Sequence, residues 1–115
     1  MASGTSFLIR AGWEPVRSLA FGSIGASYTA VGTPLAHPIR TVLIQNLTDA
    51  VVMVSFDGVN DHFPMPAFGY FVWDVTANKT REEGFFLGED DTLYVKEIGT
   101  PTTGSFYFSV VYGEQ

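Results

Sequence analysis

The densest group of potential ligand side chains in this chain runs from residue 57 to residue 62. It reads Asp57-Gly58-Val59-Asn60-Asp61-His62, so three oxygen-bearing side chains precede an imidazole. Calcium takes about six to eight oxygen ligands, often from one such loop. The stretch lacks the Asp-x-Asp-x-Asp-Gly spacing of a calcium loop, and Asp, Asn and Gly are also turn-forming residues. We therefore predict a plain turn here and no metal site.

The other reactive side chains lack partners at a useful spacing. The other of the two histidines, His37, precedes Pro38 in a loop and lies 25 residues before His62, which is not the spacing of a metal-binding pair. Residues 22–25 (Gly-Ser-Ile-Gly) resemble the Gly-x-Ser-x-Gly elbow of a serine nucleophile only superficially. The acids at 89–91 are interpreted as a solvated hairpin tip that protects a sheet edge. The sequence therefore predicts no catalytic residues, no cofactor and no enzyme.

The composition excludes several further classes. The chain has no cysteine, which removes disulfides, thiolate catalysis and cysteine-ligated zinc. Twelve acidic and six scattered basic residues give a net charge of −6, which argues against nucleic acid and acidic membrane surfaces. No apolar run approaches the ~20 residues of a membrane span, and residues 1–6 lack the features of a secretory signal. We expect a soluble protein made in a cytoplasm.

Short apolar runs in period-two alternation are the elements that must position any site. In residues 105–112, Phe106, Phe108, Val110 and Tyr112 share one face, as in a strand with one buried face. Further strands are predicted at residues 6–10, 16–21, 27–31, 40–45, 51–56, 69–75, 84–87 and 92–96. The best helix candidate, residues 75–83, carries almost no apolar stripe.

These runs predict one all-β domain over residues 1–115, an antiparallel β-sandwich of about eight strands with jelly-roll-like topology and little or no helix. A closed barrel is the alternative. Residues 1–6 are predicted to form an N-terminal arm. The short gap between the runs at 40–45 and 51–56 predicts an antiparallel hairpin. The predicted core comprises Val42, Ile44, Val52, Val54, Phe56, Phe106, Phe108 and Val110.

Aromatic residues are the remaining resource for function. Residues 63–68 (Phe-Pro-Met-Pro-Ala-Phe) are apolar, stiffened by proline and predicted to lie outside strands. The neighbouring run at 69–75 is apolar on both faces, so we expect one face in the core and the other covered by something else. The predicted interface with another subunit comprises Phe63, Met65, Phe68, Phe71 and Trp73. A second interpretation is an exposed platform that stacks on sugar rings, with Trp13, Tyr70 and Tyr94 as further candidates.

Two segments resemble small virion proteins of tailed bacteriophages. Residues 44–58 read Ile-Gln-Asn-Leu-Thr-Asp-Ala-Val-Val-Met-Val-Ser-Phe-Asp-Gly, and residues 93–96 with 104–112 are similar to the end of the same proteins. The resemblance covers about residues 40–112. It implies a virion structural protein made in the host cytoplasm, most commonly a capsid decoration (cement) protein.

That role implies the major capsid protein or other virion proteins as partners. A small domain without disulfides also gains burial by self-association, so a dimer or trimer is expected. The alternatives are a carbohydrate- or receptor-binding module of the particle and a head–tail adaptor protein.

Overall fold

The computed structural model describes residues 10–74 and 90–114 of the chain. Within them, nine strands form two antiparallel sheets, with one three-residue 3-10 turn, η2 (Phe21–Ser23). The strands are β1 (Arg10–Trp13), β2 (Arg17–Ala20), β3 (Thr29–Ala30), β4 (Ile39–Asn46), β5 (Val52–Ser55), β6 (Phe63–Met65), β7 (Tyr70–Asp74), β8 (Tyr94–Glu97) and β9 (Ser105–Glu114). The predicted all-β antiparallel class is confirmed. No helix in the described ranges is long and apolar enough to cross a membrane.

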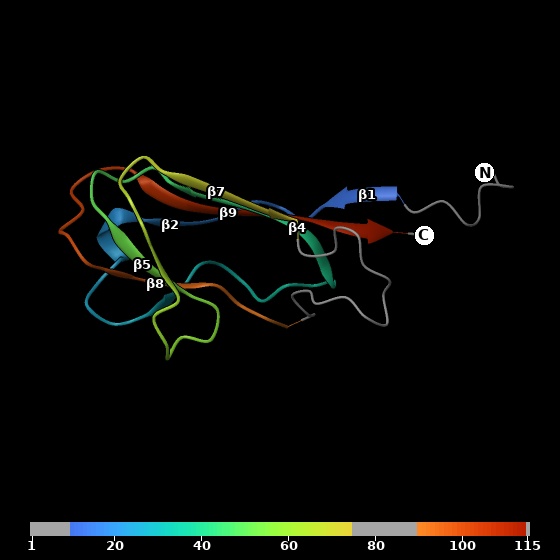
Figure 1. Cartoon of the computed structure of the whole chain (residues 1–115), viewed down its shortest axis with the longest axis horizontal. Helices are drawn as coiled ribbons and strands as arrows, with labels where there is room; N and C mark the ends of the chain where they lie inside the picture. Colours follow the sequence, from blue (N-terminus) through green and yellow to red (C-terminus); the bar gives the residue numbers. More distant parts are fainter. Residues whose placement is uncertain (1–9, 75–89, 115) are drawn as a thin grey trace, which may run out of the picture.

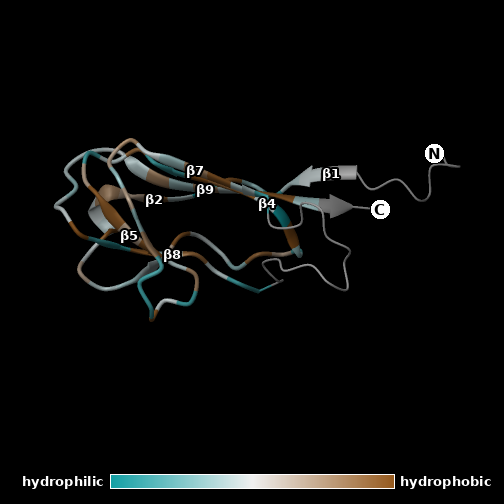
Figure 2. Ribbon diagram, viewed as in Figure 1, coloured by the Kyte–Doolittle hydropathy of each residue, from teal (hydrophilic) through white to brown (hydrophobic). Residues whose placement is uncertain are grey.

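The two sheets lie face to face around one core. The first sheet has the order β1-β9-β4-β7, and β2 also pairs with β9; the second has the order β3-β8-β5-β6. Figure 1 shows β2, β9, β4 and β7 along one side of the molecule, with β5 and β8 on the other. Figure 2 shows hydrophobic residues on strands of both layers. A buried cluster between the layers draws on both sheets.

The alternation pattern identified this core correctly. Phe106, Phe108 and Val110 of β9 are at most 1% exposed. The predicted residues of β4 and β5 (Val42, Ile44, Val52 and Val54) are fully buried beside them. Phe56 is partly buried and packs against the cluster. The face of β9 that bears Phe106, Phe108 and Val110 is thus covered, as expected for a strand with a single buried face.

β1 and β2 are two parts of one interrupted edge. Both pair with β9: Trp13 lies opposite Val111, and Arg17 lies opposite Phe108. Three residues on the edge therefore oppose two on β9, which is the count of a β-bulge. Pro15 lies in the break, where its missing N–H removes a ladder hydrogen bond.

Two predictions about connectivity are wrong. β4 and β5 do not form a hairpin, because β4 pairs with β7 and β9 while β5 pairs with β6 and β8. The connection after Asn46 carries the chain from one sheet to the other. The stretch after residue 60 is also not a connector throughout: β6 includes Pro64, which an edge strand tolerates because its N–H is not needed on the open side.

The predicted bounds of the other runs differ by a few residues. β1 extends to Trp13, whereas the sequence pattern ended the first strand at Arg10. Three predictions, the strand residues 6–9, the possible helix at 75–83 and the strand at 84–87, lie outside the described residues, as does the arm at 1–6.

Candidate functional site

An aromatic cluster closes one lateral edge of the sandwich. β6 and β7 are the last strands of their sheets, and the turn at residues 66–69 joins them across the two layers. Phe63 on β6 meets Phe71 on β7 edge to face, with ring centroids 5.1 Å apart at 89°. The ring centroid of Trp73 lies 6.4 Å from that of Phe71, and the ring centroid of Phe56 lies 6.1 Å from that of Trp73. Such tilted pairs are a favoured geometry of aromatic rings.

The structure brings most of the predicted interface residues to this edge. Phe68 is 67% exposed and Phe71 is 36% exposed, while Phe63 and Trp73 are partly buried against the core. We call Phe63, Phe68, Phe71 and Trp73 the edge patch. Met65 does not belong to it, because it faces the core at 3% exposure. Its alternation with Pro64 on β6 turns it away from the surface.

Phe68 has an unusual backbone conformation. Its φ of 60° lies in the left-handed region, which a bulky side chain rarely adopts. The turn that holds it is closed by the N–H of Gly69, which donates to the carbonyl of Pro66 at 3.0 Å. The turn therefore presents a large apolar ring to solvent at an energetic cost, where glycine would fit without strain.

Asn46 fixes the position of this turn from the end of β4. Its fully buried side-chain amide donates to the carbonyls of Met65 and Pro66 at 3.2 and 3.0 Å, and to that of Ala50 at 2.9 Å. The hydroxyl of Thr48, also fully buried, donates to Asn46 Oδ1 at 2.6 Å. One buried amide thus ties the β4–β5 crossing to the turn that carries Phe68.

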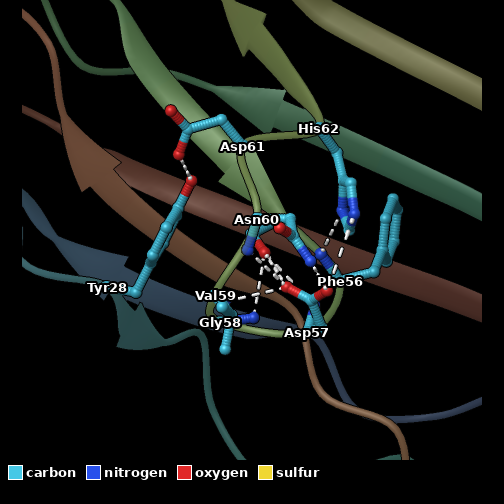
Figure 3. Close-up of polar contacts among 9 residues, drawn as sticks. Tyr28, Phe56, Asp57, Gly58, Val59, Asn60, Asp61 and His62 are labelled. Atoms are coloured by element: carbon cyan, nitrogen blue, oxygen red, sulfur yellow. Dashed lines mark hydrogen bonds and ion pairs between the residues drawn. The ribbon is translucent and has the colours of Figure 1, made fainter.

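The loop at residues 57–62, which was predicted to be a plain turn, is held by its own side chains (Figure 3). Asp57 Oδ1 accepts the N–H groups of Val59 and Asn60 at 2.8 Å each, and Asp57 Oδ2 accepts the Asn60 amide at 2.8 Å. These bonds, the one from the Asn60 N–H first, hold the pKa of Asp57 well below its ordinary value. Asp57 therefore acts as the hydrogen-bond acceptor that shapes the turn.

His62 is also engaged within this loop. Its Nδ1 accepts the backbone N–H of Phe56 at 2.9 Å, and its ring stacks on that of Phe56 with centroids 6.0 Å apart. The backbone N–H of His62 donates to the carbonyl of Val54 at 3.0 Å. The imidazole thus secures the loop to the end of β5, next to the aromatic cluster.

The far side of the loop is joined to β8 and to the segment before β3. The Tyr28 hydroxyl donates to Asp61 (Figure 3), and Lys96 reaches the same carboxylate at 3.1 Å while lying 4.8 Å above the Tyr28 ring. Burial, together with the bond to Asp61, raises the pKa of Tyr28 to about 12. The phenol therefore stays protonated at neutral pH and acts as a donor.

A second polar cluster, which the sequence pattern did not reveal, lies where the edge strand is interrupted. The Glu14 carboxylate is buried and accepts from Arg17 Nη2 at 2.7 Å, from His37 Nδ1 at 2.7 Å and from the N–H of Ala36 at 3.1 Å. The His37 ring stacks on Tyr112 at 3.7 Å between centroids. The cluster therefore attaches the β1–β2 break to the loop before β4.

Arg17 completes this attachment. It is 8% exposed, and its Nε and Nη2 donate to the carbonyls of Thr33 and Pro34 at 2.7 and 2.9 Å. Burial alone raises the pKa of Glu14, but hydrogen bonds from His37 and Arg17 outweigh it and hold the pKa below its ordinary value. Glu14 is therefore a buried carboxylate committed to structural partners.

These contacts join loops and strand ends that lie far apart in the sequence. The described residues contain no group of three or more His, Cys, Asp and Glu side chains placed to hold a metal ion. Comparison with protein-family models, with curated proteins and with solved structures found no match. The edge patch presents two exposed rings, Phe68 and Phe71, at the side of the sandwich.

Proposed function

We propose that this chain is a non-enzymatic structural protein of a tailed-phage virion, a decoration protein that binds the outside of the capsid through the edge patch. The observation that carries the proposal is Phe68, a large apolar side chain 67% exposed on a turn with φ of 60°. Strained backbone conformations persist where function requires them. A site selected only for stability favours glycine here.

The surroundings of Phe68 fit a protein-binding surface. Aromatic residues are enriched in the desolvated centres of interfaces and carry much of the binding energy. Phe71 adds an exposed ring on the adjacent strand, and Phe63 and Trp73 support it from below. Asn46 fixes the turn from within the core, so the patch is held in one geometry before it meets a partner.

The topology adds support by analogy. When β1 and β2 are counted as one interrupted strand, the two sheets have the orders 1-8-3-6 and 2-7-4-5. We infer that this is a jelly roll, an architecture that occurs in viral capsid proteins and in lectins. A fold does not determine a function. Jelly rolls occur both in virus particles, the setting of the proposed role, and in sugar-binding lectins, whose activity is the main rival. The net charge of −6 is consistent with a protein kept away from packaged DNA.

Rebinding to particles tests the proposal. Capsids of the encoding phage that lack this protein are mixed with the purified chain, and co-sedimentation is measured. Wild type is expected to bind, and Phe68→Gly is expected to bind at least about a hundredfold more weakly because the anchor is lost. Val59→Gly is the matched control, since Val59 is 78% exposed but lies in the 57–62 loop, outside the edge patch. Failure of the wild type to bind capsids would refute the proposal.

The rival function is carbohydrate or receptor binding. Trp13 and Tyr70, which are 64% and 74% exposed, are the observation in its favour. Aromatic rings that stand free on a sheet offer flat apolar surfaces to sugar rings. A glycan array distinguishes the two: binding of a host polysaccharide, lost in Trp13→Ala and unaffected by Phe68→Gly, would replace the decoration role.

A further inference from the structure

The outward-facing side of the first sheet is unusually poor in charge. Side chains alternate along a strand, and directly opposite residues share a face. Because Val42, Ile44 and Phe108 face the core, the intervening residues of the sheet face away from it. By the pairing registers these are Trp13, Ser18, Ala20, Thr41, Leu43, Gln45, Tyr70, Val72, Asp74, Ser105, Tyr107, Ser109 and Val111; Arg40, exposed in the bulge of β4 between Ile39 and Thr41, belongs with them. We call this set the outer face.

Its composition differs from that of a solvated sheet face. Antiparallel sheets with one face in water usually alternate between apolar residues inside and polar residues outside. Here Leu43 lies between Val72 and Ser109 across the strands, and Val111 lies beside Trp13. Among the outer-face residues just enumerated, Arg40 and Asp74 are the two charged side chains. Trp13, Tyr70 and Val72 are 64%, 74% and 57% exposed.

Other described strands do not cover this face. The second sheet lies on the opposite side of the first, so β5 and β8 shield only its inner face (Figure 1). Soluble monomers rarely expose contiguous apolar patches above a few hundred Å². Within the described residues, this face therefore exposes Trp13, Tyr70 and Val72 without a covering strand.

We propose that the outer face binds the outer face of a second copy of this chain, giving a two-fold symmetric dimer. The inference deepens the proposed function, which expects a homo-oligomer, by naming the surface that forms it. It uses Trp13, Leu43 and Val72, whereas the edge patch remains at the side of the sandwich for the capsid.

Charge argues for this occupant. Each copy has a net charge of −6, so two copies repel unless the surfaces that meet carry little charge. The outer face satisfies this condition. Its two charged side chains, Arg40 and Asp74, have opposite signs, so the face has little net charge with which to attract a strongly acidic or basic partner. A face that is nearly neutral and bears both aromatic and aliphatic side chains suits a copy of itself.

The area is also adequate. Eight residues of β4 span about 26 Å, and four strand positions span about 19 Å, which gives about 500 Å² in projection. Side chains that stand on the sheet raise the accessible area above its projection, toward the roughly 800 Å² per partner of a stable complex. Because one patch meets its own copy, the symmetry is that of a closed dimer rather than a trimer or a filament.

Molar mass in solution tests the inference. Light scattering after size exclusion, followed by sedimentation equilibrium, is expected to give twice the chain mass of 12.6 kDa for the wild type. Val72→Asp is expected to weaken self-association at least about a hundredfold, because each dimer then buries two added negative charges. Val59→Asp is the matched control and is expected to stay dimeric, since Val59 lies in the 57–62 loop, off the outer face.

The other outcomes distinguish failure of the dimer from failure of the decoration role. A monomeric or trimeric wild type contradicts it directly, whether or not Val72→Asp folds. A dimer that persists in Val72→Asp and in Trp13→Asp places the contact elsewhere. A monomeric wild type whose tryptophan fluorescence responds to an oligosaccharide, and no longer does so in Trp13→Ala, assigns the face to sugar. Dimerisation without capsid binding refutes the decoration role alone. A Phe68→Gly variant that still dimerises but no longer binds capsids shows that the two surfaces act separately.

Discussion

Glu14→Gln is the substitution whose consequence follows most directly from the contacts described. The Glu14 carboxylate is buried and accepts hydrogen bonds from Arg17, Ala36 and His37. Glutamine keeps the size but replaces one acceptor oxygen with a donor amide. At least one of the three donors then loses its acceptor, and the Arg17 guanidinium stays buried without a counter-charge.

The expected loss of unfolding free energy is about 3–5 kcal/mol, the range found when one partner of a buried ion pair is removed. A domain of this size has a total stability of about 5–15 kcal/mol, so the variant is expected to be marginal. Urea m-values are about 1–3 kcal/mol per M, so a loss of 4 kcal/mol lowers the urea midpoint by about 1.3–4 M. Equilibrium urea unfolding followed by tryptophan fluorescence measures this shift.

A double-mutant cycle with Arg17→Met tests the reason for the loss. Arg17 Nη1 is buried and has no hydrogen-bond partner, so the pair itself already carries a desolvation penalty. We expect Glu14→Gln/Arg17→Met to be more stable than Glu14→Gln alone, because the double variant no longer buries an unpaired charge. A loss below about 1 kcal/mol for Glu14→Gln, or losses that simply add, would refute the structural role of the pair.

Four further outcomes are expected. Phe108→Ala lowers the unfolding free energy by about 3–5 kcal/mol, because it deletes a fully buried ring and leaves a cavity; a loss below about 1 kcal/mol in urea unfolding would mean that this residue faces solvent. Gly104→Ala is strongly destabilising, since φ is +87° and an added Cβ would lie 2.0 Å from the carbonyl oxygen of Leu47; a thermal midpoint equal to the wild type would contradict the observed turn. The pKa of Asp57 is lowered in the folded state, so its stabilisation is complete above the ordinary Asp pKa of about 3.9 and is lost as the pH falls below it; Asp57→Asn should therefore show a smaller fall in thermal midpoint between pH 5 and pH 2, and an unchanged pH profile would argue against these hydrogen bonds. Calcium and EDTA leave the thermal midpoint unchanged, because both Asp57 oxygens already accept hydrogen bonds; a rise of several degrees with calcium would show binding to the native state.

Strands with one buried face could be predicted well because period-two alternation records burial directly. β9 shows this: of the four residues predicted to share a face, Phe106, Phe108 and Val110 are buried, and Tyr112 is partly buried against the core. Sheet partners could not be predicted in the same way. β4 and β5 are close in sequence but lie in different sheets, and the buried Asn46 amide at the end of β4 binds carbonyls near residue 65. That contact depends on long-range packing and leaves no local pattern.

The candidate sites divide along the same line. The apolar, proline-rich segment before β7 was enough to predict the edge patch. It was not enough to predict β6, because proline argues against a central strand but is tolerated in an edge strand. The Glu14 cluster was missed because His37 is 23 residues from Glu14, and only the fold brings them within 2.7 Å. The spacing of Glu14 and Arg17 was the one local signal, and three-residue acid–base pairs are common on any surface.

The central claim is that the turn bearing Phe68 binds another protein surface in the assembled particle. Hydrogen–deuterium exchange of the chain, free and bound to capsids, tests it most directly. The account predicts protection on binding at the Gly69 amide and its neighbours, in the turn between β6 and β7, with no change in the loop at residues 57–62. Capsid-bound protein whose exchange is unaltered across residues 66–72, or protected only around residues 57–62, would contradict it.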